Sequence, residues 1–262
     1  MRLFFRKYGS GKPIIILHGL YGISDNWVGI GKRLSENFTV YLPDLRNHGQ
    51  SPFSPTMNYP SMADDLGEFI ETNELPAPVI IGHSMGGKVA MQFALDNPDI
   101  PSRLVVVDIS PGTYPLETIH LDVLQAMMSV DFTSISSRSE VEHHISLWIP
   151  DRRLQLFIMK NLYRKTRTSF GWRLNLTAIN DNLEALAEGV ISHRPFTLPV
   201  LFIKGGRSGY IRPEDNPPIH EYFPNSEIKE IKDAGHWVHA DTPIELSAIL
   251  SQFLSKDCTM KD

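Results

Sequence analysis

The sequence has only one cysteine, Cys258, among its 262 residues. A disulfide within the chain and a metal site built from thiolates are therefore both excluded. No stretch approaches the roughly 18 consecutive apolar residues of a membrane-spanning helix, and the segment from Met1 to Lys7 lacks the apolar core of a signal peptide. Positive charge is not in excess either, since the formal net charge is −5, which argues against a general binder of nucleic acid or acidic membranes. We expect a cytoplasmic protein, monomeric or weakly dimeric, that neither binds nucleic acid nor inserts into a membrane.

Short apolar runs alternate along the chain with stretches of helical periodicity. Continuous apolar runs are typical of strands buried on both faces of a parallel sheet; they occur at residues 14–17, 79–81, 104–107 and 200–203, with further strand patterns at 2–7, 39–42 and 227–231. Helical patterns occur at 26–34, at 62–72 with Ser61 as the N-cap, from 89 to 94, and at 243–254. The alternation predicts an α/β fold, with a mostly parallel sheet covered by helices on both faces.

The alternation stops between residues 112 and 195. Apolar residues at helical spacing occur at 116–128, 140–148, 154–162 and 175–187, and no convincing central strand is present. The break follows a strand, so the inserted segment lies at the carboxyl edge of the sheet, where ligands bind in such folds. We predict a core domain of residues 1–111 and 196–262 and a helical cap of residues 112–195.

A candidate nucleophile lies between the run 79–81 and the following helical pattern. From Gly82 to Gly86 the chain reads Gly-His-Ser-Met-Gly, and strand, sharp turn and helix form the context of a nucleophile elbow. The helix beyond Ser84 begins with free N–H groups and a positive dipole end, which favour an oxyanion. The alternative is a glycine-rich turn with a solvent-facing serine, but the partners described next favour catalysis.

A serine nucleophile needs an adjacent base that a third group orients. In this kind of fold the histidine comes last in the chain. His236 follows Gly235 in the loop between the pattern 227–231 and the last helix, and we favour it as the base. His239 is the competing histidine, with a local hydrogen bond at the helix start as its simpler role.

The acid is less obvious, because the turn after the run 200–203 contains no carboxylate. Asp108 ends the neighbouring strand and could reach the histidine from nearly the same place, although capping a turn is the ordinary task of an aspartate there. Asp215 and Asp233 are the alternatives, in that order. Ser208 occupies the vacated turn, and we expect its hydroxyl to support His236 or Asp108.

Two backbone N–H groups form the predicted oxyanion hole. One belongs to Met85, the residue after the nucleophile, and the other to Leu20, in the loop after the first core strand. Gly19 allows that loop to turn its amides inward. His18 lies on the oxyanion side, so we do not interpret it as a base.

Other polar residues have simpler interpretations. The segment 44–51 contains His48 but no second ligand at metal spacing, so we expect no metal and no cofactor. We interpret the segment as a structural loop in which Arg46 pairs with Asp44. His143 and His144 are adjacent on a predicted helix, point in different directions, and are expected at the surface.

Substrate contacts are expected in part from the cap. Its basic residues are Arg152, Arg153, Lys160, Arg164, Lys165, Arg167 and Arg173. Such charges usually form a solvated face, but some could meet an anionic leaving group such as the phosphates of coenzyme A. The candidate contacts are His18, Trp148, Trp237, Arg152 and Arg153. Other aromatic residues of the cap are more often core than pocket lining.

Five motifs in order carry a resemblance to a known family. They are residues 44–49 (DLRNHG), 57–66 (MNYPSMADDL), 82–88 (GHSMGGK), 108–111 (DISP) and 234–240 (AGHWVHA). With them the chain resembles the α/β-hydrolase superfamily, in particular the bacterial YbfF-type esterases and the mitochondrial abhydrolase-domain esterases. The resemblance implies an ester or thioester hydrolase with a helical cap, and it supports Asp108 as the acid with a serine at 208. Alternatives are a carbon–carbon bond hydrolase or eliminating lyase with the same triad, and a non-catalytic receptor.

Overall fold

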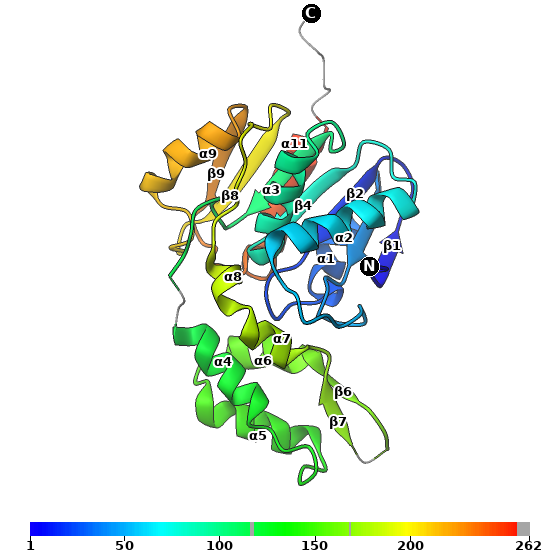
Figure 1. Cartoon of the computed structure of the whole chain (residues 1–262), viewed down its shortest axis with the longest axis vertical. Helices are drawn as coiled ribbons and strands as arrows, with labels where there is room; N and C mark the ends of the chain where they lie inside the picture. The colour runs from blue at the N-terminus through cyan, green and yellow to red at the C-terminus, as the bar shows by residue number, and fades with distance from the viewer. Residues whose placement is uncertain (116–117, 168, 256–262) are drawn as a thin grey trace, which may run out of the picture.

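The protein is described by a computed structural model that covers residues 1–115, 118–167 and 169–255. A seven-stranded sheet has the strand order β1-β3-β2-β4-β5-β8-β9. The strands are β1 (Phe5–Tyr8), β2 (Pro13–Leu17), β3 (Thr39–Pro43), β4 (Val79–His83), β5 (Arg103–Val107), β8 (Val200–Gly205) and β9 (Ser226–Ile231). Only β1 runs antiparallel to its neighbour within this sheet. The predicted α/β fold with a mostly parallel, doubly covered sheet is confirmed (Figure 1).

Helices cover both faces of this sheet because successive strand residues point to opposite sides. Ile14 and Ile16 of β2 pack with α1 (Val28–Leu34), α10 (Val238–Asp241) and α11 (Pro243–Leu254). Ile15 and Leu17 belong to the opposite core, which includes residues of α2 (Tyr59–Thr72), α3 (Met85–Asp96) and α9 (Asn216–Tyr222). Every residue of β2, β4 and β5 is buried, as the continuous apolar runs predict.

Between β5 and β8 the chain forms a separate group of elements, and we call residues 112–195 the insertion. It contains α4 (Thr118–Met128), α5 (Arg138–Trp148), α6 (Arg152–Ile158), β6 (Leu162–Arg164), β7 (Phe170–Trp172), α7 (Leu176–Asp181) and α8 (Leu183–Ala187). In Figure 1 these elements gather on one side of the sheet, away from α9 and α11. Residues 112–115 and 188–195 join the insertion to the core, and we call them its two linkers. They run side by side, since Tyr114 donates its N–H to the carbonyl of Ala187 (2.8 Å) and Val190 donates to that of Pro111 (2.9 Å).

Several predicted boundaries are wrong. Asn58, and not Ser61, caps α2: its Oδ1 accepts the N–H of Ser61 (2.9 Å), because the helix begins three residues before the predicted start and has Pro60 in its first turn. The segment 154–162 ends in a 3-10 turn (Met159–Asn161) that leads into β6, and Asn182 separates α7 from α8. The start of the predicted helix at Leu116, and Cys258, lie outside the described residues.

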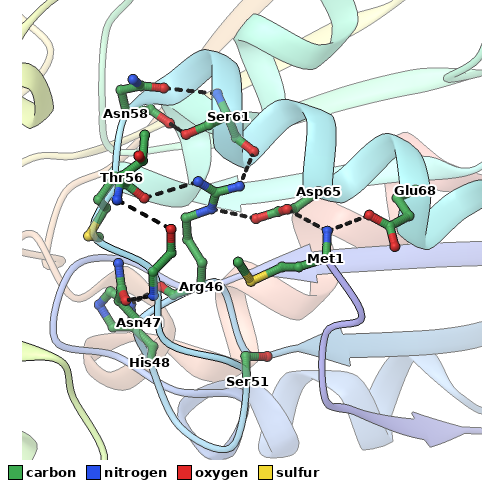
Figure 2. A network of polar contacts seen from close by, with 12 residues as sticks. Met1, Arg46, Asn47, His48, Ser51, Thr56, Asn58, Ser61, Asp65 and Glu68 are labelled. Atoms are coloured by element: carbon green, nitrogen blue, oxygen red, sulfur yellow. Dashed lines mark hydrogen bonds and ion pairs between the residues drawn. The ribbon is translucent and has the colours of Figure 1, made fainter. Parts of the chain in front are cut away.

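The loop after β3 is structural, as expected, but its ion pair was predicted wrongly. Arg46 Nε lies 2.6 Å from Asp65 Oδ2 on α2, and its two terminal nitrogens donate to the carbonyls of Thr56 (3.0 Å) and Ser61 (2.8 Å). Figure 2 shows this guanidinium reaching from the loop to the helix. The carboxylate of Asp44 instead accepts backbone N–H groups, including that of Ser24 (2.7 Å). Arg46 thus holds the loop against α2.

Candidate active site

Ser84 stands between β4 and α3 in a strained conformation. Its φ is 53°, a left-handed value that non-glycine residues rarely adopt. The turn is tight enough that a Cβ at Gly82 would lie 2.2 Å from the carbonyl oxygen of Gly86, and one at Gly86 would lie 2.5 Å from that of His18. Glycine at these two positions therefore permits the bend that exposes the serine hydroxyl.

A chain of hydrogen bonds links Ser84, His236 and Asp108. His236 Nε2 lies 3.0 Å from Ser84 Oγ, and its Nδ1 lies 2.8 Å from Asp108 Oδ2. Because an ionised carboxylate only accepts hydrogen bonds, Nδ1 carries the proton and Nε2 is left to accept the serine proton. The structure thus brings together the three residues predicted to act as nucleophile, base and acid, in the arrangement of a serine hydrolase.

The carboxylate of Asp108 is fully buried and has two further donors. Its Oδ1 accepts the N–H of Gly205 (2.8 Å), and its Oδ2 also accepts the hydroxyl of Ser208. Of the two partners expected for Ser208, the structure places its hydroxyl on the aspartate. These bonds fix the carboxylate oxygen that faces His236.

The competing acids have other partners. Asp215 Oδ1 accepts the hydroxyl of Ser110 (2.9 Å), and its Oδ2 accepts the N–H of Arg212 (2.7 Å). No hydrogen bond or ion pair in the described part of the chain joins His236 to the carboxylate of Asp215 or Asp233.

His239, the competing base, is buried in the core. Its ring stacks on Trp27 with centroids 4.5 Å apart, and its Nδ1 has no partner among the described residues, so the expected local hydrogen bond is not present. Burial, with a smaller contribution from Lys160, lowers the pKa of His239 to about 3. His239 is therefore neutral near pH 7, and its ring also contacts that of His83, with centroids 5.0 Å apart.

Two aromatic residues that the sequence analysis did not single out hold His236 in place. Tyr210 stacks on its ring with centroids 4.0 Å apart. His83 donates from Nε2 to the backbone carbonyl of His236 (2.8 Å), and burial keeps the pKa of His83 well below its usual value. The position of His83 next to the nucleophile is a signal that could have pointed to it. Tyr210 could be found only from the fold.

The predicted oxyanion donors lie beside the serine. Met85 is the first residue of α3, so its N–H has no partner within the helix. The loop of Leu20 comes close because Gly19 has no side chain, and a Cβ there would lie 3.1 Å from Ser84 Cβ.

The ring of His18 is hydrogen-bonded to the backbone of the Gly19–Leu20 loop and of the loop after β3. Its Nδ1 bonds to the carbonyl of Gly19 (2.9 Å), its Nε2 accepts the N–H of Leu45 (3.0 Å), and burial lowers its pKa to about 4. Both ring nitrogens are therefore engaged by the backbone, and His18 also lines the larger of the two cavities that meet at Ser84.

Two cavities meet at Ser84. The larger one, of about 210 Å³, is lined by residues that include His18, Leu20, Phe157, His236 and Trp237. The smaller one, of about 70 Å³, is lined by residues that include Leu20, Met85, Lys88, Tyr114 and Leu186. Side chains shared by the two linings are Leu20, Ser84, His120 and Tyr210. A substrate with its carbonyl at Ser84 can thus extend in two directions.

Of the other residues predicted to contact a substrate, some line a cavity at Ser84 or the groove beside it and some do not. Trp237 lines the larger cavity, whereas Trp148 is 43% exposed and lines none of the cavities described here. Arg152 bonds to Glu142 (2.9 Å) and also lies away from them. Arg153 pairs with Asp241 and lines an outer groove of about 410 Å³, which shares Trp237 with the larger cavity. The structure therefore does not bring Trp148 or Arg152 to the site.

Among the described side chains, no group of three or more histidine, cysteine, aspartate or glutamate residues could hold a metal ion. Within that part of the chain, no helix combines the length and the apolar character that crossing a bilayer requires.

The chain is similar to known proteins of one fold family. The family described as alpha/beta hydrolase fold matches residues 12–243. The sn-1-specific diacylglycerol lipase ABHD11 of Danio rerio is 37% identical over 256 residues, which are 95% of this chain and 80% of that protein. Esterase YbfF of Escherichia coli is 29% identical over 246 residues, 94% of each chain. A solved structure named marine microorganism esterase has a TM-score of 0.93 and 43% identity, covering 96% of this chain and 98% of its own.

Proposed function

This chain belongs to the alpha/beta hydrolase fold family and is a hydrolase of the esterase and lipase type. We propose that it cleaves carboxylic esters through an acyl-enzyme on Ser84. The observation that carries the proposal is the hydrogen-bonded chain from Ser84 through His236 to Asp108. A receptor that only binds its ligand would not need this arrangement.

The proposed reaction uses groups of the chain itself. Ser84 Oγ attacks the ester carbonyl while His236 Nε2 takes its proton, and Asp108 stabilises the imidazolium that forms. The amides of Leu20 and Met85 stabilise the oxyanion in a preorganised site. His236 then protonates the leaving alcohol, and a water molecule hydrolyses the acyl-enzyme by the same steps.

We further propose that the insertion acts as a cap over this chemistry. Val123 of α4 and Leu154 and Phe157 of α6 line the larger cavity together with Ser84. The residues that would contact a substrate thus come from the insertion as well as from the core.

Covalent labelling tests the nucleophile. A fluorophosphonate probe should label the wild-type protein and leave the Ser84→Ala variant unlabelled, and p-nitrophenyl esters should be hydrolysed with kcat lower by about 10⁶ in that variant. Equal labelling of both proteins would remove Ser84 as the nucleophile. Labelling without ester hydrolysis would favour the carbon–carbon hydrolase or lyase alternative.

A thioester substrate such as an acyl-CoA is the second candidate. Arg153 and Lys160 line the outer groove beyond the larger cavity, and arginine and lysine bind phosphate oxygens well. The test compares kcat/KM for an acyl-CoA and an uncharged ester of the same acyl chain over a range of salt concentrations. Preference for the acyl-CoA that weakens with salt supports this candidate, and equal, salt-independent constants reject it.

A further inference from the structure

Lys88 is a buried cation next to Ser84 that the reaction above does not use. It lies one turn into α3, where its N–H donates to the carbonyl of Ser84 (3.1 Å), and it is 1% exposed. Its Nζ donates to the carbonyls of Gly112 (2.7 Å) and Glu188, one on each linker of the insertion. The ammonium has three N–H groups, so two are engaged by these carbonyls.

The ammonium of Lys88 forms no ion pair with a carboxylate of the described residues. Its other neighbours are the rings of Tyr59 and Tyr114, with centroids 5.3 Å and 4.9 Å from Nζ. Burial raises the pKa of both phenols, so the rings are neutral at pH 7. A buried cation without an anionic partner is costly, and an anionic ligand would offset that cost.

Burial lowers the pKa of Lys88 to about 8, an effect that the charge of Glu188 partly opposes. The ammonium form therefore still predominates at pH 7.

Lys88 lines the smaller of the two cavities at Ser84. Apart from this ammonium the wall is largely apolar or aromatic, and the described lining residues include Leu20, Tyr59, Ile109, Leu183 and Leu186. Among the described lining residues, Lys88 is the only lysine, arginine or carboxylate in this small and largely apolar cavity, and it lies one helical turn from the nucleophile.

The position of His236 indicates which part of an ester enters this space. His236 and Trp237 line the larger cavity and are not among the residues that line the smaller one in the described structure. Because His236 must protonate the leaving group, the leaving group belongs in the larger cavity. The acyl chain then extends past Met85 into the smaller cavity.

We infer that the smaller cavity is an acyl subsite in which the ammonium of Lys88 binds a carboxylate at the far end of the acyl chain, so that the preferred substrates are monoesters of short dicarboxylic acids. The inference rests on the proposed ester hydrolysis at Ser84. The small volume of this cavity, about 70 Å³, favours a short acyl chain, and chains of four and five carbons are the ones to test.

Matched substrates test the inference. Monoethyl glutarate and ethyl pentanoate have the same acyl length and differ in a terminal carboxylate, as do monoethyl succinate and ethyl butyrate. The wild-type enzyme should show a kcat/KM at least about tenfold higher for the monoester, as a charge-assisted bond provides. In Lys88→Met this ratio should fall to about one or below, whereas Lys88→Arg should keep a preference for the charged ester. The ratio of the two kcat/KM values is the readout, because loss of the bonds from Lys88 to the linkers would lower kcat/KM for the charged and the uncharged ester alike.

A second measurement needs no variant. Glutaramate should inhibit wild-type hydrolysis of ethyl pentanoate competitively, with an inhibition constant at least about tenfold lower than that of pentanamide, which has the same length and no carboxylate. Equal constants for the charged and uncharged esters, or an unchanged ratio in Lys88→Met, would overturn the acyl subsite. Failure of the wild-type enzyme to hydrolyse any of the four esters would instead contradict the proposed function.

Discussion

Ser84 and Asp108 both hold positive φ values, 53° and 54°, although neither is glycine. Such conformations cost about 1–3 kcal/mol each and persist only where the surroundings fix them. Here the neighbouring strands do so: Ser84 donates its N–H to Val107 (3.0 Å), and Asp108 donates to Ile203 (2.8 Å). The sheet therefore sets the direction of both side chains at the point where each strand ends.

Asp108→Asn tests how far the imidazole depends on this carboxylate. We expect kcat for a simple ester to fall by about 10⁴, because the amide no longer holds the tautomer in which Nε2 accepts the serine proton. Asp215→Asn is the matched control and should stay within about tenfold of the wild type, since Asp215 bonds to Ser110 and not to His236. An Asp108→Asn enzyme with wild-type kcat would remove Asp108 as the acid.

Ser208→Ala tests the positioning of Asp108. The hydroxyl donates to Oδ2, the same oxygen that accepts from His236, so its loss should lower kcat by about tenfold, the equivalent of one hydrogen bond to a charged group. Ser208→Thr keeps a hydroxyl and should recover most of the rate. A wild-type kcat in Ser208→Ala, or no recovery in Ser208→Thr, would contradict this role.

The main candidate residues could be predicted because each is tied to a strand end or to a motif in fixed chain order. The pairing of Arg46 could not, because Asp65 lies 19 residues away and only the packing of α2 brings it within reach. The same limit applies to Tyr210 and Lys88, whose importance depends on which rings and linkers the fold places around them.

At the scale of elements, the turn from β4 to α3 depends on glycines, which have no side chain. Gly82→Ala should lower the free energy of unfolding by more than about 4 kcal/mol or prevent folding, because its Cβ would lie 2.2 Å from a backbone carbonyl that cannot move aside. Gly29→Ala in α1 is the control: nothing lies within 4 Å of its Cβ, and the change should stabilise by about 0.5–1 kcal/mol. Urea unfolding followed by circular dichroism measures both, and similar effects in the two variants would contradict the tight turn.

The central strands were found from sequence because buried parallel strands are continuously apolar. The strands β6 and β7 have three residues each, too few to show an alternating pattern. The start of α9, Asn216-Pro217-Pro218, is typical of a loop in sequence, although proline is well accepted in the first turn of a helix.

At the scale of the whole molecule, four buried histidines make stability depend on pH. They are His18, His48, His83 and His239. Burial lowers the pKa of His48 to about 3 and that of His18 to about 4, and it lowers the other two as well. Since the unfolded state binds protons below about pH 6.5 and the folded state does not, this stability is fully present above pH 6.5. It is lost as the pH falls toward the folded-state values.

His48→Gln isolates one of these contributions. Between pH 7.5 and 5.0 the free energy of unfolding should fall by about 2 kcal/mol less in this variant than in the wild type, because one buried group no longer resists protonation. His220→Gln, at an exposed position, should show the wild-type loss. Urea unfolding at the two pH values is the measurement, and an identical loss in His48→Gln would contradict the prediction.

The paired linkers of the insertion have a further consequence. Pro111 and Val190 are hydrogen-bonded to each other, and β5 and β8 are already in register from Leu104 and Val200 onward. The strand ends that hold Asp108 and Ser84 are therefore held together by the sheet itself, and the insertion contacts the core through its linkers and through loops such as that of Asn47, whose carbonyl accepts the N–H of Asn175 (2.9 Å). Changes in Val123, Leu154 or Phe157 of the insertion would alter the wall of the larger cavity, whereas the hydrogen bonds that fix the reacting groups lie within the core.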